Sequence, residues 1–185
     1  MTRKFVALAV LMLAAACTPP LVATPPTEPI QIGFYSVVPQ IQWNRSMYSA
    51  SEAWTIDGYA LQALRFVSVA DGETFSGEKD TDGKAPVFRK TMLPNELQEF
   101  MIETLVGNGW TSVKPAGLKP AKFGDLPGFR FTFSMKSDDG LEYDGSALGT
   151  VKDDTLHLIV YMGTRLHYYP KYAKDVEKLF ASIRT

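Results

Sequence analysis

The chain has 185 residues, of which 45% are hydrophobic and 21% are charged, and it contains one cysteine. These proportions are typical of a soluble globular domain and exclude a disordered, collagen-like or multi-pass membrane chain. The net charge is −1 without any basic block, so nucleic acid is not expected as a partner, because phosphate binding needs clustered Lys and Arg. With a single cysteine, no disulfide can form within the chain.

The first 16 residues have the pattern of a bacterial secretory signal. Arg3 and Lys4 precede an apolar run from Phe5 to Ala16, and the run ends in small residues. As a helix, these 12 residues would reach about 18 Å, which is short of the roughly 30 Å hydrocarbon core of a membrane. We therefore expect residues 1–16 to direct export and then to be removed.

The end of this signal, Leu13-Ala-Ala-Ala-Cys17, resembles the lipobox of bacterial lipoproteins. In that family the cysteine is lipidated and becomes the mature N-terminus, and Leu usually stands three places earlier, where this chain has Ala14. The resemblance implies that the lipid on Cys17 anchors the protein to a membrane of the cell envelope, and Thr18, in place of Asp, favours the outer membrane facing the periplasm. The alternative is ordinary cleavage after Ala16, which would release a soluble periplasmic protein.

Residues 17–29 are expected to form a tether that begins with the lipidated cysteine. The twelve residues after that cysteine contain five of the chain's 12 prolines and no aromatic residue, a composition typical of extended linkers. At about 3.1 Å per residue, such a segment could hold the domain up to about 37 Å from the membrane. The remaining residues, 30–185, suffice for one domain of ordinary size.

The domain is predicted to be α+β, an antiparallel sheet covered by two helices. Ile41 and Trp43 alternate with polar neighbours in residues 39–45, which predicts a first strand. A second strand is expected in residues 60–73, which are rich in β-branched and aromatic side chains and close on an Asp-Gly turn signal. The polar, Gly-rich residues 75–85 are predicted to form a surface loop.

Two helices follow from the helical spacing of apolar residues. Pro94 is expected to open the first helix and Gly107-Asn-Gly109 to end it, while Pro170 is expected to open the second. Their apolar faces are predicted to contain Leu97, Phe100, Met101 and Leu105 in the first helix, and Ala173, Val176, Phe180 and Ile183 in the second.

A meander of three antiparallel strands is predicted between the helices. Its strands and turns are Phe129–Lys136, the turn Asp138-Asp139-Gly140, Leu141–Val151, the turn Asp153-Asp154, and Leu156–Met162. Gly145 and Gly149 are candidate bulges in the returning strand. Phe131 and Phe180 lie on the apolar sides of their own elements, so we expect them to share one core.

This order of elements resembles the PsbP-like and DcrB-like group of small α/β domains. The residues that carry the resemblance are the strands FRFTFSM and TLHLIVYM and the closing helix YPKYAKDVEKLFASIR. The resemblance implies a structural or partner-binding role, and several members of the group are bacterial lipoproteins.

Two short motifs approach known sites without completing them. The segment from Glu78 to Gly83 approaches the calcium loop D-x-D-x-D-G, but Arg89 stands where the loop needs its bidentate Glu. An acidic surface loop is the other interpretation. Ser76-Gly-Glu-Lys79 matches the S-x-x-K of penicillin-interacting enzymes, but no K-T-G follows it. We therefore expect no metal site and assign no catalytic residue here.

The two histidines give no defined site either. His157 falls within a predicted strand and His167 follows that strand, and no clustered Cys or carboxylates accompany them, so neither zinc nor another cofactor is expected. A Ser-His-carboxylate triad whose members meet only in space stays open.

The most distinctive candidate surface joins the last strand to the last helix. It contains Arg165, His167, Tyr168, Tyr169 and Tyr172, and Arg and Tyr are enriched at binding hot spots. The alternative is that the tyrosines fasten the helix to the sheet.

Two functional classes remain. The first is a lipid-anchored envelope protein that binds an envelope protein or another ligand without catalysis. The second is a periplasmic hydrolase with a dispersed active site. The absence of a complete catalytic motif favours the first, and the sequence does not identify the ligand.

Overall fold

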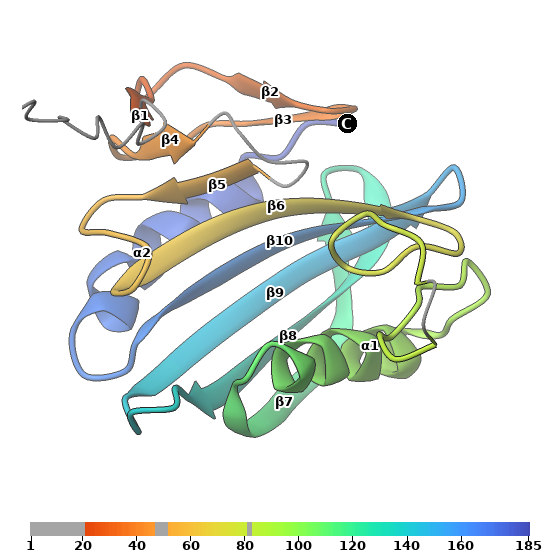
Figure 1. Ribbon diagram of the computed structural model, residues 1–185. Coiled ribbons are helices and arrows are strands. Elements are labelled where there is room, and N and C mark those ends of the chain that lie inside the picture. The colour runs from red at the N-terminus through yellow and green to blue at the C-terminus, as the bar shows by residue number, and fades with distance from the viewer. Residues whose placement is uncertain (1–20, 47–51, 81–82) are drawn as a thin grey trace, which may run out of the picture.

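The computed structural model describes residues 21–46, 52–80 and 83–185. Its elements in chain order are β1 (Leu21–Ala23), β2 (Ile30–Ile32), β3 (Tyr35–Val37), β4 (Asn44–Ser46), β5 (Glu52–Thr55), β6 (Gln62–Ala70), α1 (Pro94–Gly107), β7 (Thr111–Phe123), β8 (Leu126–Lys136), β9 (Glu142–Lys152), β10 (Thr155–Thr164) and α2 (Tyr168–Ala181) (Figure 1). The main sheet has the order β1-β4-β5-β6-β10-β9-β8-β7 with antiparallel neighbours, and β2 and β3 form a separate hairpin. The α+β class is confirmed.

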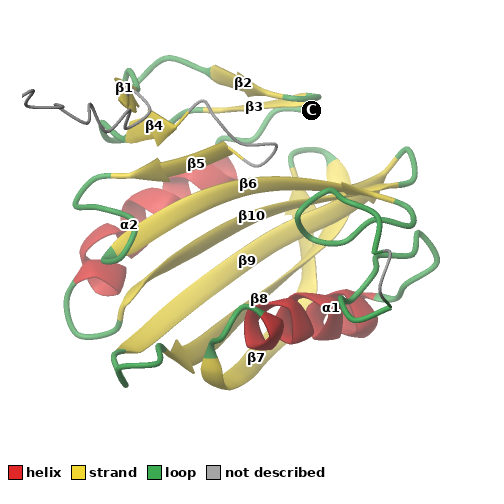
Figure 2. Cartoon of the chain, in the orientation of Figure 1, coloured by secondary structure: helices red, strands yellow, loops and turns green. Residues whose placement is uncertain are grey.

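The two helices cover opposite faces of the sheet (Figure 2). Alternate residues of a strand point to opposite faces, and β10 shows both: Leu158 packs with the buried residues of α1, whereas Ile159 packs with those of α2. The prediction that Phe131 and Phe180 share one core is therefore wrong. Phe131 lies in the core under α1 and Phe180 in the core under α2. The spacing of apolar residues predicts which side of a helix is buried, but it does not predict which face of the sheet the helix covers.

The predicted meander is confirmed and extends by one strand. Strands β8, β9 and β10 are consecutive neighbours with unbroken register, and β7 adds a fourth, outer strand. Sequence periodicity missed β7 because Pro115 and Pro120 interrupt it and its pairing with β8 shifts twice. Proline is tolerated at a sheet edge, where no outer neighbour needs its missing N–H.

The glycines of β9 are not bulges, which corrects the sequence interpretation. The register of β9 with both neighbours is continuous through Gly145 and Gly149. A Cβ at Gly145 would lie 2.1 Å from Cζ of Phe133, and one at Gly149 would lie 2.5 Å from Cδ2 of Leu158. These positions lack side chains because large residues of the neighbouring strands fill the space above them.

The N-terminal boundary of the domain also needs correction. Residues 21–29 were expected in the tether, but β1 pairs with β4, and Thr24 is buried. The Thr24 N–H donates to the Trp43 carbonyl at 2.8 Å, and the Trp43 N–H donates to Thr24 Oγ1 at 2.9 Å. The domain therefore includes Leu21 onward rather than beginning at residue 30. The signal segment and Cys17 lie outside the described residues.

Other element boundaries shift by a few residues. The strand expected at 39–45 begins only at Asn44, as β4, and Trp43 just before it is fully buried. Helix α1 begins at Pro94 as predicted, and α2 begins at Tyr168, two residues before Pro170. No helix in the described part of the chain is long and apolar enough to span a membrane.

Candidate functional site

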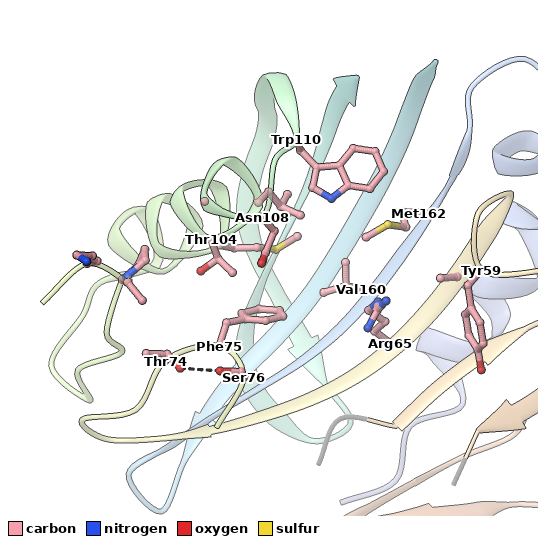
Figure 3. A pocket seen from close by; sticks show the side chains of 17 residues that line it. Tyr59, Arg65, Thr74, Phe75, Ser76, Thr104, Asn108, Trp110, Val160 and Met162 are labelled. Atoms are coloured by element: carbon pink, nitrogen blue, oxygen red, sulfur yellow. Dashed lines mark hydrogen bonds between the residues drawn. The ribbon is translucent and has the colours of Figure 1, made fainter. Parts of the chain in front are cut away.

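The candidate site is a cavity of about 640 Å³ on the face of the sheet that α1 covers (Figure 3). Its walls are α1, the loop that follows β6, and the two central strands β6 and β10. The volume lies within the roughly 300–1,000 Å³ of small-molecule pockets in proteins. The three walls come from distant parts of the chain, so the cavity exists only in the folded domain.

The first wall, which is the floor of the cavity, is formed by four side chains of the central strands. Ala63 and Arg65 come from β6, and Met162 and Val160 stand opposite them in β10. Residues two apart in a strand share a face, and directly paired residues lie on the same face. The floor is therefore apolar apart from one guanidinium group.

Helix α1 supplies the second wall. Met101, Thr104 and Leu105 line the cavity because residues three and four apart share one side of a helix. The Thr104 hydroxyl donates to the Phe100 carbonyl at 2.8 Å, so its methyl group adds to the apolar surface. The helix starts firmly at Pro94, where the preceding Leu93 N–H donates to the Glu96 carboxylate at 2.6 Å.

The third wall is the loop predicted at residues 75–85. Phe75 lines the cavity and packs toward Phe100, with 6.2 Å between the ring centroids. Thr74 and Ser76 share a hydrogen bond of 2.9 Å between their hydroxyl oxygens. A bridge between Thr74 and Val87 closes the base of the loop. The loop prediction was right about the backbone, but Phe75 is packed inward.

The calcium interpretation of this loop rests partly on residues that are not described. Asp82 lies outside the described residues, and one carboxylate oxygen of Asp80 accepts a hydrogen bond from the Ala85 N–H at 3.3 Å. No group of three or more metal-ligating side chains occurs among the described residues.

Trp110 stands at the end of the cavity beyond the C-terminus of α1 (Figure 3). Its ring meets Tyr143 edge-on, with 4.9 Å between centroids. The Tyr143 hydroxyl donates to the Ala60 carbonyl, and burial raises the pKa of Tyr143. The tyrosine therefore holds the indole in place while the other side of the indole faces the cavity.

The charged residues of the lining are both basic. They are Arg65 on the floor and Lys84 in the loop, and no Asp or Glu lines the cavity. The cross-strand neighbours of Arg65 are Ala53 and Val160. Within the described residues, Arg65 makes no hydrogen bond or ion pair through its side chain. The Arg65 side chain is half-buried, and the N–H donors of its guanidinium group are not used by any acceptor in the described part of the chain.

The surface proposed at the start of α2 is used mainly for internal contacts. Arg165 pairs with Asp144 at 2.9 Å and with Glu142 at 2.7 Å, and the hydrogen bond that Arg165 donates to Asp144 raises the pKa of Arg165. His167 is exposed and meets the Tyr168 ring edge-on. Much of the surface that could reach a partner is therefore already engaged within the domain.

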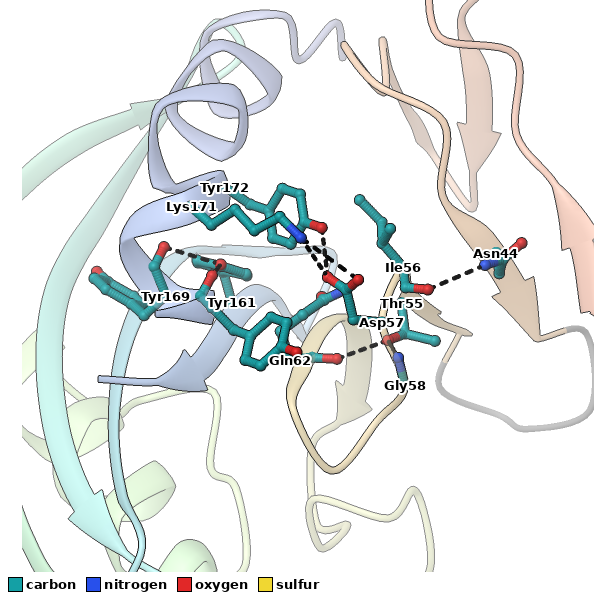
Figure 4. Close-up of polar contacts among 11 residues, drawn as sticks. Asn44, Thr55, Ile56, Asp57, Gly58, Gln62, Tyr161, Tyr169, Lys171 and Tyr172 are labelled. Carbon is teal, nitrogen blue, oxygen red and sulfur yellow. Dashed lines mark hydrogen bonds and ion pairs between the residues drawn. The ribbon is translucent and has the colours of Figure 1, made fainter. Parts of the chain in front are cut away.

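The tyrosines of this region fasten α2 to the sheet (Figure 4). Tyr169 stacks on Tyr161 with 5.2 Å between centroids, and the Tyr161 hydroxyl donates to the Tyr168 carbonyl at 2.8 Å. Tyr172 is buried and donates its hydroxyl hydrogen to Asp57. This hydrogen bond, with the nearby Lys171 ammonium, holds the pKa of Asp57 below its usual range. These contacts support the fastening interpretation.

One serine–histidine contact lies on the other face of the sheet, away from the cavity. The hydroxyl oxygen of Ser68 lies 2.9 Å from His157 Nδ1. Burial lowers the pKa of His157, and the charge of Lys152 lowers it further. The Phe34 ring packs edge-on against the imidazole at 4.5 Å. Among the described residues, no carboxylate forms a hydrogen bond with His157, so the pair is not a triad.

Sequence reasoning missed the residues that distinguish the cavity. The sequence pattern predicts a strand around Arg65 without a role for its side chain, and it predicts no element that contains Trp110. The available signal was a charged residue inside the apolar run ALRFVSV. This charged residue points to a binding site only in the folded structure, where Arg65 lies on the cavity face and its paired neighbours, Val160 and Ala53, carry no carboxylate.

Comparisons with known proteins give the fold but no activity. No family model matches the chain, and no curated protein matches its sequence. The chain is similar to a protein from Bacteroides thetaiotaomicron VPI-5482 whose crystal structure was determined at 1.50 Å, with a TM-score of 0.51 and 12% identity over 87% of this chain. The chain spans about half the length of that protein, 49%. At this identity the likeness shows the fold alone.

Proposed function

We propose that the chain is a lipid-anchored protein of the bacterial cell envelope that binds a small ligand with a large apolar part, without catalysis, in the cavity between α1 and the sheet. The observation that carries the proposal is the cavity itself, whose floor is apolar apart from Arg65 and whose lining includes the aromatic side chains of Phe75 and Trp110. Such cavities are the usual form of small-molecule sites.

The envelope location rests on the N-terminal sequence. Export follows from the charged and apolar pattern of residues 1–16, and anchoring follows from the lipobox-like segment that ends at Cys17. Radioactive palmitate should label the wild-type protein and leave the Cys17→Ser variant unlabelled. A labelled variant would refute anchoring at this residue and favour the soluble periplasmic alternative.

Binding is preferred to hydrolysis because of how the candidate groups are placed. The Ser68–His157 pair lies on the α2 face, whereas the cavity lies on the α1 face. A serine hydrolase needs its nucleophile and base beside the bound substrate. The hydrolase alternative would therefore need a second ligand site around Ser68.

A neutral fluorescent dye tests the cavity as a binding site. The exported protein is made with Cys17→Ser, so that no acyl chain of its own can enter the cavity, and is titrated with Nile red. We expect saturable binding with a blue shift of the dye emission. Thr104→Trp places a large ring against the cavity wall and should weaken binding about tenfold or more.

Glu99→Trp is the matched control, because it places the same side chain on an exposed position of the same helix, outside the cavity. It should leave the affinity for Nile red unchanged. Equal affinities of the two variants, with both folded by circular dichroism, would show that this cavity is not the binding site.

A further inference from the structure

We propose that the natural ligand is an anionic single-chain amphiphile of the fatty-acid type, whose head group pairs with Arg65 while its alkyl chain lies along the apolar wall of the cavity. This inference rests on the proposed function and specifies the chemistry of the ligand. The juxtaposition that carries it is an unpaired guanidinium beside the apolar side chains of the cavity floor (Figure 3).

The position of Arg65 has no structural explanation within the described residues. Its strand neighbours, Ala53 and Val160, offer no acceptor side chain. Its side chain is half-buried, and its guanidinium N–H groups stay available for a bound ligand. A ligand carboxylate would supply the missing acceptors, because the planar guanidinium matches a carboxylate with two parallel hydrogen bonds.

All charged side chains that line the cavity are positive, as Arg65 is. Lys84 is the second cation, and no acidic side chain lines the cavity. After removal of residues 1–16 the chain has 17 basic and 20 acidic side chains, a net charge of −3. A cavity with two cations and no carboxylate in an acidic chain favours an anion over a cation or a neutral head group.

The apolar walls fit a flexible alkyl chain. Met101 and Met162 line opposite sides, one on α1 and one on β10, and methionine side chains adapt to ligands of variable shape. Phe75 and Trp110 give two aromatic surfaces. A ligand with one anionic end and one long apolar body uses all these groups, whereas a compact polar anion would leave the apolar walls unused.

Trp110 gives an optical signal for binding. Trp43 and Trp54 are fully buried in the core under α2, on the other face of the sheet. Trp110 is half-buried and lines the cavity. A ligand-dependent change in indole emission should therefore arise from Trp110 and disappear in Trp110→Phe.

The test compares ligands that share one chain and differ in the head group. The exported protein with Cys17→Ser is titrated with dodecanoate, dodecyl phosphate, methyl dodecanoate and dodecyltrimethylammonium, all below their micelle concentrations. Dodecanoate should bind most tightly. Arg65→Gln should weaken dodecanoate binding about 10- to 100-fold, the effect expected for a charge-assisted hydrogen bond, and leave methyl dodecanoate unchanged.

Two further variants control for folding and for general charge effects. Arg89→Gln removes an exposed arginine outside the cavity and should leave dodecanoate binding unchanged. Arg65→Glu should reverse the order of affinities, so that dodecyltrimethylammonium binds better than dodecanoate. A stronger response to dodecyl phosphate than to dodecanoate would identify a phosphate head instead of a carboxylate and would overturn the fatty-acid assignment.

The outcomes separate this inference from the proposed function. If Nile red binds and is displaced by methyl dodecanoate, but Arg65→Gln binds dodecanoate as tightly as wild type, the cavity is a binding site and the role assigned to Arg65 is wrong. If neither the dye nor any of the four amphiphiles binds, the proposed function itself fails.

Discussion

Phe133 occupies the space that a side chain at Gly145 would need. The two residues are directly paired across β8 and β9, and the Phe133 ring lies over the glycine. Gly145→Ala should lower the free energy of unfolding by about 1–3 kcal/mol, because the ring must move out of a packed core. Urea unfolding measures the change.

Gly107→Ala is the matched control for this prediction. A Cβ built at Gly107, in the last position of α1, meets no atom within 4 Å apart from its own chain neighbours and the helix backbone. The control should be neutral or stabilising by up to about 1 kcal/mol, because alanine lowers the entropy of the unfolded chain. Equal losses in both variants would show that the close packing at Gly145 does not limit stability.

The two cores should respond independently to substitution. Phe131 and Phe180 are buried on opposite faces of the sheet. Phe131→Leu and Phe180→Leu should each lower the free energy of unfolding by about 1–2 kcal/mol, and the double variant should lose the sum to within about 0.5 kcal/mol. A coupling energy above about 1 kcal/mol in urea unfolding would mean that the two side chains communicate through the sheet.

The hydrogen bond between Tyr172 and Asp57 should contribute to stability in a pH-dependent way. Tyr172→Phe should cost about 1–2 kcal/mol at pH 7. The Asp57 pKa is lower in the folded protein than its ordinary value of 3.8, so the contribution is fully present above that value and is lost as the pH falls through the lowered folded pKa. Thermal unfolding of the two proteins at pH 7 and in strong acid measures the difference, which should be nearly absent in acid.

His157 should make the protein less stable below its ordinary pKa. The folded pKa lies below 6.5 because of burial, so below pH 6.5 the unfolded state binds the proton more readily than the folded state, and stability falls with decreasing pH. His157→Gln should remove this part of the pH dependence in urea unfolding, whereas His167→Gln, at an exposed position, should retain it. Identical pH profiles for wild type and His157→Gln would contradict the assignment.

Elements whose pattern is local could be predicted from the sequence. The unbroken alternation from Phe129 to Met135 became one face of β8, and Pro94 opened α1 as expected. Elements defined by pairing could not: β1 and β5 are too short to show a period, and the prolines of β7 hide its strand. The face on which each helix lies depends on chain connections, so the sequence did not separate the two cores.

The candidate site was even less accessible to sequence reasoning. The cavity combines Arg65, Phe75 and Trp110 with residues of two other elements, and no spacing along the chain links them. The surface proposed around Arg165 was chosen for residue types that favour binding, but the same types also fasten a helix to a sheet. An arginine available for a ligand differs from one used inside the domain by the acceptors beside it. Arg165 has Asp144 and Glu142, and Arg65 has none among the described residues.

The pairing of β1 with β4 has a consequence for how the domain meets the membrane. Because Leu21 is already part of the sheet, a lipid on Cys17 would be joined to it by four residue steps, which span at most about 14 Å even when fully extended. This length is less than half of the roughly 37 Å that the expected tether of twelve residues could span. The domain would then be held close to the lipid head groups, with the β1 edge of the main sheet nearest to the anchor.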